Sequence, residues 1–307
     1  MVSFVRNDIS PSRNIPEVLS AVVSVIGDRL SGKTAYIATL ARWPGDDSST
    51  SPVQQVKPIN DDTEELITDA ENILEQGEMF AGTDFYLRAY EIPSYSLNIV
   101  LKDLFSKQQP WIGVSSPVIE LNIICKEYSG DFFKRVLHQA NEPLFQDYLE
   151  DCVKASGIML LVDGLANHKD REYANILNKF LIELERVEAG MRKRRIALVI
   201  TKCDQPELWV NRHQPRQITR IRFPQVMKKL QAWEQSGAGN FNCFATSVLG
   251  MLGEQYPEPN VRYVMDNSGH GTRPSVLKNP QRWKPFGLIA PLYWLCTGER
   301  HMKLEQD

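Results

Sequence analysis

One short segment constrains the fold of this chain more than any other feature. It fits the pattern G-x-x-x-x-G-K-[ST] and comprises Gly27, Asp28, Arg29, Leu30, Ser31, Gly32, Lys33 and Thr34. An apolar run at 21–26, typical of a buried strand, precedes it, and 35–41 follows with a helical pattern. A phosphate-binding loop needs this context, because N–H groups of the loop and of the helix N-terminus bind phosphate oxygens. A glycine-rich turn that matches by chance is the alternative, and the flanking elements argue against it.

Two side chains of this segment have predicted roles. Lys33 is expected to reach the β- and γ-phosphates of a nucleoside triphosphate, and the Thr34 hydroxyl is expected to bind Mg²⁺. A phosphate-binding loop does not identify the base, so a second motif has to do so.

The segment Thr201-Lys202-Cys203-Asp204 follows another apolar run, at 196–200, and is the candidate base-binding motif. A carboxylate at Asp204 can accept from both the N1–H and the exocyclic amine of guanine, as a charge-assisted pair. Adenine offers no such pair of donors. The stem of Lys202 can cover the base or the sugar. A four-residue motif is a weak match by itself. Its position after a predicted strand and downstream of the phosphate-binding loop favours guanine as the bound base.

Composition is consistent with an intracellular protein that has a sizeable core. The chain has 307 residues, 42% of them hydrophobic, which is enough for one large domain with insertions or for two small ones. A net charge of −3 does not indicate a general nucleic-acid or membrane-surface binder. Five scattered cysteines without a C-x-x-C pair are typical of reduced thiols, and no stretch approaches the roughly 20 apolar residues of a membrane span. We therefore expect a cytoplasmic location.

Strand and helix patterns alternate along the chain. We predict a mostly parallel six-stranded sheet with helices on both faces, because alternating elements of this kind form parallel sheets covered on each side. A loop is expected from 43 to 58, and one long helical region over 131–155. The expected organisation is an N-terminal extension at 1–18, one domain at 19–298 with insertions near 44–82, 205–237 and 250–285, and a tail at 299–307.

With the two motifs in this order, the chain resembles the P-loop GTPases with a Ras-like core, in the translation-factor-related class. The segments Ser31–Leu40 and Leu74–Thr83 are similar to sequences of the bacterial double-GTPase families. The resemblance implies that the protein binds GTP or GDP with Mg²⁺. It also implies a switch in a multi-protein bacterial system, with a protein effector or activating partner. No membrane association is expected, and nucleic acid is not an expected partner.

The resemblance also assigns the remaining positions of the site. Thr83 would be the switch threonine that binds Mg²⁺. In Glu127-Tyr128-Ser129-Gly130 the usual D-x-x-G aspartate is replaced by Glu127, which would hold Mg²⁺ through a water. The N–H of Gly130 would bind the γ-phosphate. Ser247 and Val248 stand where a backbone N–H contacts the guanine oxygen.

Asp163, at the end of the apolar run 158–162, competes with Glu127 for the metal role. The family fold needs a helix, a strand and a helix between this motif and the guanine motif. The interval from Asp163 to Thr201 holds one helix before the strand, whereas the interval from Glu127 is long enough for all three. Glu127 is therefore favoured.

Lys33, Asp131 and Arg29 are the candidate catalytic residues. Asp131 stands where the family has a water-positioning glutamine, and an aspartate is shorter and charged. Arg29 can either stabilise transition-state charge or block the approach of water. We expect slow or partner-activated GTP hydrolysis. A nucleotide-gated scaffold without meaningful hydrolysis and an ATP-using P-loop enzyme are the alternatives.

Two further segments have simpler interpretations. The insertion at 205–237 is rich in Arg and Lys, which favours a solvated helix face over a nucleic-acid surface, since base-stacking aromatic residues are sparse there. The apolar segment 286–296 is expected to form a helix, for which packing against the sheet is favoured over docking of a partner.

Overall fold

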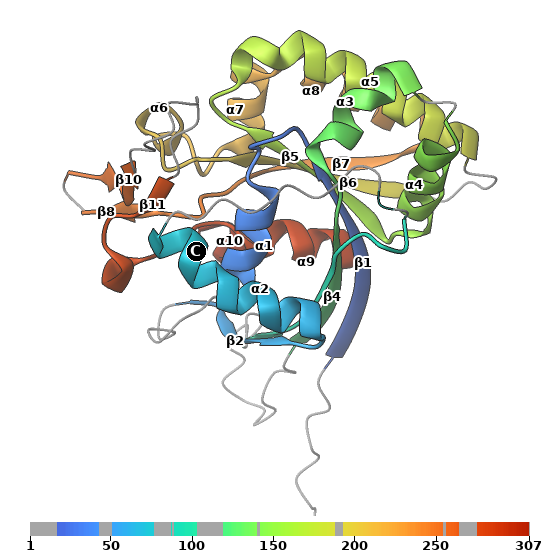
Figure 1. The fold of residues 1–307 in the computed structure, drawn as a ribbon. Coiled ribbons are helices and arrows are strands. Elements are labelled where there is room, and N and C mark those ends of the chain that lie inside the picture. The colour runs from blue at the N-terminus through green and yellow to red at the C-terminus, as the bar shows by residue number, and fades with distance from the viewer. Residues whose placement is uncertain are drawn as a thin grey trace, which may run out of the picture.

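The structure, a computed structural model, describes residues 17–42, 51–76, 87, 89–102, 119–139, 142–187, 193–253, 256–263 and 275–306. Its centre is a seven-stranded sheet in the order β2-β3-β4-β1-β5-β6-β7 (Figure 1). The strands are β1 (Glu17–Gly27), β2 (Val53–Pro58), β3 (Ser94–Leu101), β4 (Ile119–Glu127), β5 (Gly157–Asp163), β6 (Arg194–Thr201) and β7 (Gly239–Ala245).

Most of the sheet is parallel. β1 pairs in parallel with β4 on one side and with β5 on the other, and β6 and β7 continue in the same direction. β3 runs antiparallel to both β4 and β2. The expected α/β class and mostly parallel sheet are confirmed, but the expected count of six strands is wrong. The additional strand is β2, a short edge strand whose exposed glutamine and lysine residues hid it within a predicted loop.

Helices cover both faces of this sheet, as expected (Figure 1). One face packs against α1, α2, α9 and α10, and the other against α3, α4, α5, α7 and α8. The bounds are α1 Lys33–Arg42, α2 Asp61–Glu71, α3 Gly130–Gln139, α4 Pro143–Lys154, α5 Asp170–Val187, α6 Pro206–Trp209, α7 Pro215–Arg222, α8 Pro224–Gln235, α9 Ile289–Thr297 and α10 Met302–Gln306. Short helical turns add Asn72–Gln76, Asn167–Lys169 and Pro280–Arg282.

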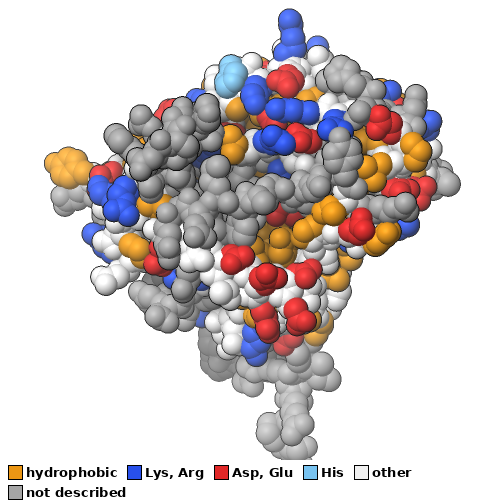
Figure 2. All heavy atoms as spheres, in the orientation of Figure 1, with side chains coloured by type: hydrophobic (Ala, Val, Ile, Leu, Met, Phe, Trp, Pro, Cys, Tyr) orange, Lys and Arg blue, Asp and Glu red, His pale blue; other side chains and the backbone are white. Residues whose placement is uncertain are grey.

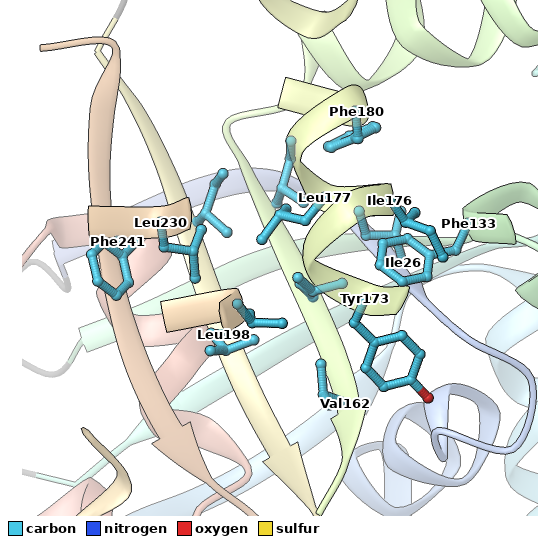
Figure 3. Packing of buried hydrophobic residues seen from close by; sticks show 14 of the residues in the cluster. Ile26, Phe133, Val162, Tyr173, Ile176, Leu177, Phe180, Leu198, Leu230 and Phe241 are labelled. Carbon is cyan, nitrogen blue, oxygen red and sulfur yellow. The ribbon is translucent and has the colours of Figure 1, made fainter. Parts of the chain in front are cut away.

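Two hydrophobic cores follow from the alternation of side chains along buried strands. In β5, Ile158, Leu160 and Val162 belong to one core, whereas Met159 and Leu161 belong to the other. Figure 3 shows the first core, where α5 lays one apolar face over the sheet. The helical segment 286–296 was expected to pack on the sheet, and the side chains of α9 are buried in the second core.

Several element boundaries differ from those expected. The helical region over 131–155 forms two helices, and α4 begins at Pro143, a residue that suits the first turn of a new helix. β1 begins at Glu17, within the segment assigned to the N-terminal extension. α10 lies in the predicted tail and buries Leu304.

The described part of the insertion near 250–285 contains four short strands. They form two small two-stranded sheets, from β8 (Met251–Leu252) with β9 (Glu258–Pro259) and from β10 (Val261–Tyr263) with β11 (Ser275–Leu277). Among the helices that the structure describes, none is long and apolar enough to cross a bilayer.

Candidate functional site

The topology creates a crevice at the carboxyl end of β1. From this strand the chain passes to α1 on one face of the sheet, whereas from the neighbouring strand β4 it passes to α3 on the other face. Ligands of open α/β sheets bind where adjacent connections leave on opposite faces, outside the carboxyl ends of the strands. Gly27 and Glu127 end these two strands, so the predicted phosphate loop and the predicted metal residue lie side by side.

The backbone of the predicted phosphate loop depends on two glycines. A Cβ on Gly27 would lie 2.3 Å from the carbonyl oxygen of Leu161, so the loop leaves β1 too close to β5 for any other residue. Gly32 has φ +87°, a left-handed conformation that favours glycine. Leu30 has φ 63° without being glycine, and its side chain is exposed at the outside of the loop.

Lys33 lies folded back onto this loop. Its ammonium nitrogen donates to the carbonyl oxygens of Gly27 and Asp28, at 3.1 Å each. Burial lowers the pKa of Lys33, and the carboxylates of Glu127, Asp28 and Asp131 oppose that shift. The first N–H groups of α1, which starts at Lys33, have no carbonyl one turn earlier in the helix to bond. A buried cation beside the N–H groups of a helix start suits an anion.

Thr34 and Glu127 bring two oxygen ligands together at the base of the loop. The Thr34 hydroxyl donates to Oε1 of Glu127 at 2.5 Å. Burial raises the pKa of Glu127, while the Thr34 hydrogen bond and the charge of Lys33 lower it in part. Alcohol and carboxylate oxygens are the ligands that Mg²⁺ prefers, so this pair fits the ion. The third predicted metal ligand, Thr83, lies outside the described residues.

The start of α3 lies directly against the loop. A Cβ on Gly130 would lie 2.6 Å from the backbone nitrogen of Arg29, so this approach requires glycine. The Arg29 guanidinium forms an ion pair with Asp131 at 2.6 Å. All three predicted catalytic residues therefore lie around one loop, and two of them bind each other.

Asp28 is held by residues that sequence reasoning missed. Its carboxylate is 2% exposed and pairs with Lys134 at 3.2 Å and Lys169 at 2.8 Å, and it accepts from the Tyr173 hydroxyl at 3.0 Å. Burial alone would raise the pKa of Asp28, but these donors outweigh it and leave the pKa below its usual value. Nothing in the sequence pattern marks Lys169 or Tyr173 as partners of the loop, because both act across long separations.

The predicted guanine motif lies on the same edge of the sheet and touches the phosphate loop. The Thr201 hydroxyl donates to the carbonyl oxygen of Ser31 at 2.9 Å, across a separation of 170 positions. Lys202 has φ 59° and forms an ion pair with Asp163 at 2.6 Å. Asp163 is thus engaged with the guanine motif, whereas Glu127 is the carboxylate that meets Thr34.

Asp204 is a buried carboxylate, 4% exposed, whose two oxygens have different partners. Oδ1 accepts from the Ser247 hydroxyl at 2.8 Å, and Oδ2 accepts from the Gln205 amide at 2.8 Å. The Ser247 backbone pairs with that of Phe286, and the carbonyl of Val248 accepts from the Trp283 indole at 2.8 Å. The insertion before α9 therefore supports the loop on which the base would rest.

Charge is unevenly distributed over the face of the molecule that Figure 2 shows. Figure 2 shows acidic side chains gathered over α2, and Lys and Arg side chains gathered higher on the same face. α2 contributes Asp61, Asp62, Glu64, Glu65 and Asp69 and has no basic residue. The predicted site therefore lies on a face with both signs of charge.

Comparisons with known proteins do not identify this chain. No family model matches it, and no curated protein sequence matches it. Among solved structures, the small GTPase Arl6 BBS3 from Trypanosoma brucei, with a bound nucleotide analogue GppNp, is 13% identical with a TM-score of 0.35, over 75% of this chain and 88% of that chain. The signal recognition particle receptor SRb-GTP/SRX complex from Chaetomium thermophilum matches with 14% identity and a TM-score of 0.38, over 75% of this chain and 91% of that chain. Both TM-scores lie below 0.5.

Proposed function

We propose that this chain binds GTP and GDP with Mg²⁺ at the carboxyl edge of its sheet and acts as a nucleotide-controlled switch. The observation that carries the proposal is the hydrogen bond from Thr201 to Ser31, which joins a phosphate-binding sequence to a guanine-binding sequence. The first motif offers N–H groups and Lys33 to phosphates. The second offers the buried Asp204 carboxylate to the two donors of guanine.

Within this proposal, Thr34 and Glu127 would hold Mg²⁺, with Thr83 as a further ligand. The ion would supply neutralisation of the charge on the β- and γ-phosphate oxygens. Lys33 would leave its two loop carbonyls for the phosphates. The N–H of Gly130, at the start of α3, would detect the γ-phosphate, and loss of that phosphate would let the segment around it rearrange.

Hydrolysis would be slow in this proposal. Asp131 stands where the family has a water-positioning glutamine, and an aspartate is shorter and charged. The same departure favours a second candidate function, a nucleotide-gated scaffold without meaningful hydrolysis. The sequence resemblance to the bacterial double-GTPase families supports a role within a multi-protein system, with an effector or activating partner.

Calorimetry with GTP, GDP and ATP, with and without Mg²⁺, tests the proposal. We expect both guanine nucleotides to bind and ATP not to bind. Asp204→Ala should weaken GDP binding by at least about 100-fold, because two hydrogen bonds to a buried charge are lost. Asp204→Asn should shift the preference toward xanthine nucleotides, which present a carbonyl where guanine has its amine.

Glu207→Ala is the matched control, because Glu207 is an exposed acidic residue only three positions away. Equal affinity for ATP and GTP, or an Asp204→Ala variant that binds GDP like the Glu207→Ala variant, would refute the guanine assignment. Single-turnover hydrolysis in the same preparation, with Lys33→Ala as the blank, separates the switch from the scaffold.

A further inference from the structure

Two consecutive residues of the phosphate loop, of opposite charge, pair with two residues of opposite charge on α3. Arg29 binds Asp131 at 2.6 Å, and Asp28 binds Lys134 at 3.2 Å. Asp131 and Lys134 are three positions apart, so they share one face of the helix. Among the described residues, two ion pairs thus join the loop to the N-terminal half of α3.

The two ion pairs differ in how easily they break. The Asp28 carboxylate is almost wholly buried, and it accepts from Lys169 and Tyr173 as well as from the Arg29 backbone N–H at 2.7 Å. These contacts fix the backbone of Arg29. The side chains of Arg29 and Asp131 are 68% and 28% exposed, and exposed pairs of this kind are worth about 0–1 kcal/mol. An anion with more charge than a carboxylate can therefore replace Asp131 as the partner of the Arg29 guanidinium.

The location of this weak pair determines which anion would compete. Gly130, whose N–H is expected to meet the γ-phosphate, packs on the backbone of Arg29. The charge of Asp131 also reaches Lys33, the residue expected at the β- and γ-phosphates. The Asp131 carboxylate and a terminal phosphate would thus occupy the same neighbourhood and would be alternative partners for the same guanidinium.

We propose that Arg29 distinguishes a nucleoside triphosphate from a diphosphate. Its guanidinium stays paired with the Asp131 carboxylate until a γ-phosphate replaces that carboxylate. This inference rests on the proposed function. A diphosphate leaves the Arg29–Asp131 pair intact. A triphosphate transfers Arg29 to the γ-phosphate and releases Asp131, so the N-terminal half of α3 loses that ion pair with the loop while the Asp28–Lys134 ion pair remains.

The test compares the dissociation constants of GDP and the non-hydrolysable analogue GppNp, both with Mg²⁺, across a set of variants. Arg29→Ala should weaken GppNp binding by roughly 10- to 100-fold, because a hydrogen bond between two charged groups is lost, and should leave GDP nearly unchanged. Arg29→Lys should retain part of the preference, since the charge remains. Asp131→Asn should strengthen GppNp binding by up to about fivefold, because the competing carboxylate is gone.

The matched control is Arg171→Ala, which removes an exposed arginine from the second position of α5. It should leave both dissociation constants as in the wild type. Equal weakening of GDP and GppNp by Arg29→Ala, or no weakening of GppNp, would overturn the inference while the proposed function stands. If the wild type binds neither guanine nucleotide, the proposed function fails and this inference fails with it. If Arg29→Ala does not fold, Asp131→Asn alone decides, and unchanged GppNp affinity in that variant counts against the inference.

Discussion

At the scale of single residues, the least expected feature is a buried carboxylate within a loop that is predicted to bind anionic phosphates. Asp28 is tolerated there because two lysines and a tyrosine hydroxyl surround it. Those donors come from α3, from the turn before α5 and from α5 itself. One side chain therefore ties the loop to three other segments, which explains how a loop with a strained residue at Leu30 keeps one conformation.

The lowered pKa of Asp28 makes a pH-dependent contribution to stability. The unfolded chain binds this proton more readily, so the contribution is full above the ordinary value of 3.8 and is lost as the pH falls through the lower native pKa. We expect Asp28→Asn to reduce the free energy of unfolding by about 2 kcal/mol at pH 6. The difference from wild type should shrink below about pH 4. Urea unfolding of both proteins between pH 2.5 and 6 measures it, and a difference independent of pH would contradict the assignment.

At the scale of elements, α5 connects the core to the site. Its apolar face packs over the sheet, and Figure 3 shows Tyr173 near one end of that face with its hydroxyl beyond the core side chains. At the same end of the helix, the Asp170 carboxylate accepts from the backbone N–H groups of Gln225 and Val226 at 2.9 and 3.1 Å, at the start of α8. α5 therefore positions a neighbouring helix and the phosphate loop together.

This role predicts a large difference between two apolar residues of α5. Leu177 is 1% exposed and Ile182 is 53% exposed. Leu177→Ala should lower the free energy of unfolding by about 2–5 kcal/mol, because it leaves a cavity in the core. Ile182→Ala, the control, should change it by no more than about 0.5 kcal/mol. Chemical denaturation measures both, and equal effects would mean that α5 does not pack as described.

At the scale of the whole molecule, the proposed ligand spans segments that are far apart in the chain. The predicted phosphate loop follows β1, the predicted metal residue ends β4, and the predicted base-binding residues follow β6 and β7. Hydrogen bonds such as those from Thr201 to Ser31 and from Thr34 to Glu127 already join these parts. A bound nucleotide would add contacts among all of them, so binding should stabilise the domain as a unit.

We therefore expect a concentration-dependent increase in the thermal unfolding temperature with GDP and Mg²⁺. A ligand at 1,000 times its dissociation constant stabilises a protein by about 4 kcal/mol, which corresponds to several degrees in a domain of this size. Lys33→Ala should lose most of this increase. Differential scanning calorimetry with increasing GDP measures it, and an equal increase in the Lys33→Ala variant would show that the nucleotide stabilises the protein from another place.

Much of the fold can be predicted from the sequence because it depends on local patterns. The apolar runs at 158–162 and 196–200 predict buried parallel strands, and the structure places β5 and β6 there. The glycine pattern before Lys33 predicts the turn between β1 and α1. The edge strand β2 is not predicted from the sequence, because half of its residues are polar and exposed. Such a strand shows no alternation of apolar and polar residues. Pro143, a helix-start residue, was the available signal for the break between α3 and α4.

The kinds of residue that meet at the end of the sheet follow from the sequence, since parallel strands bring their carboxyl ends to one edge. The number of elements before Thr201 favours Glu127 over Asp163 as the metal residue, and in the structure Glu127 contacts Thr34 whereas Asp163 contacts Lys202. The partners of Asp28 and Arg29, in contrast, depend on the tertiary structure. Lys134 and Lys169 are far from the loop in the chain, and ion pairs at such separations depend on how helices dock, which no local periodicity encodes.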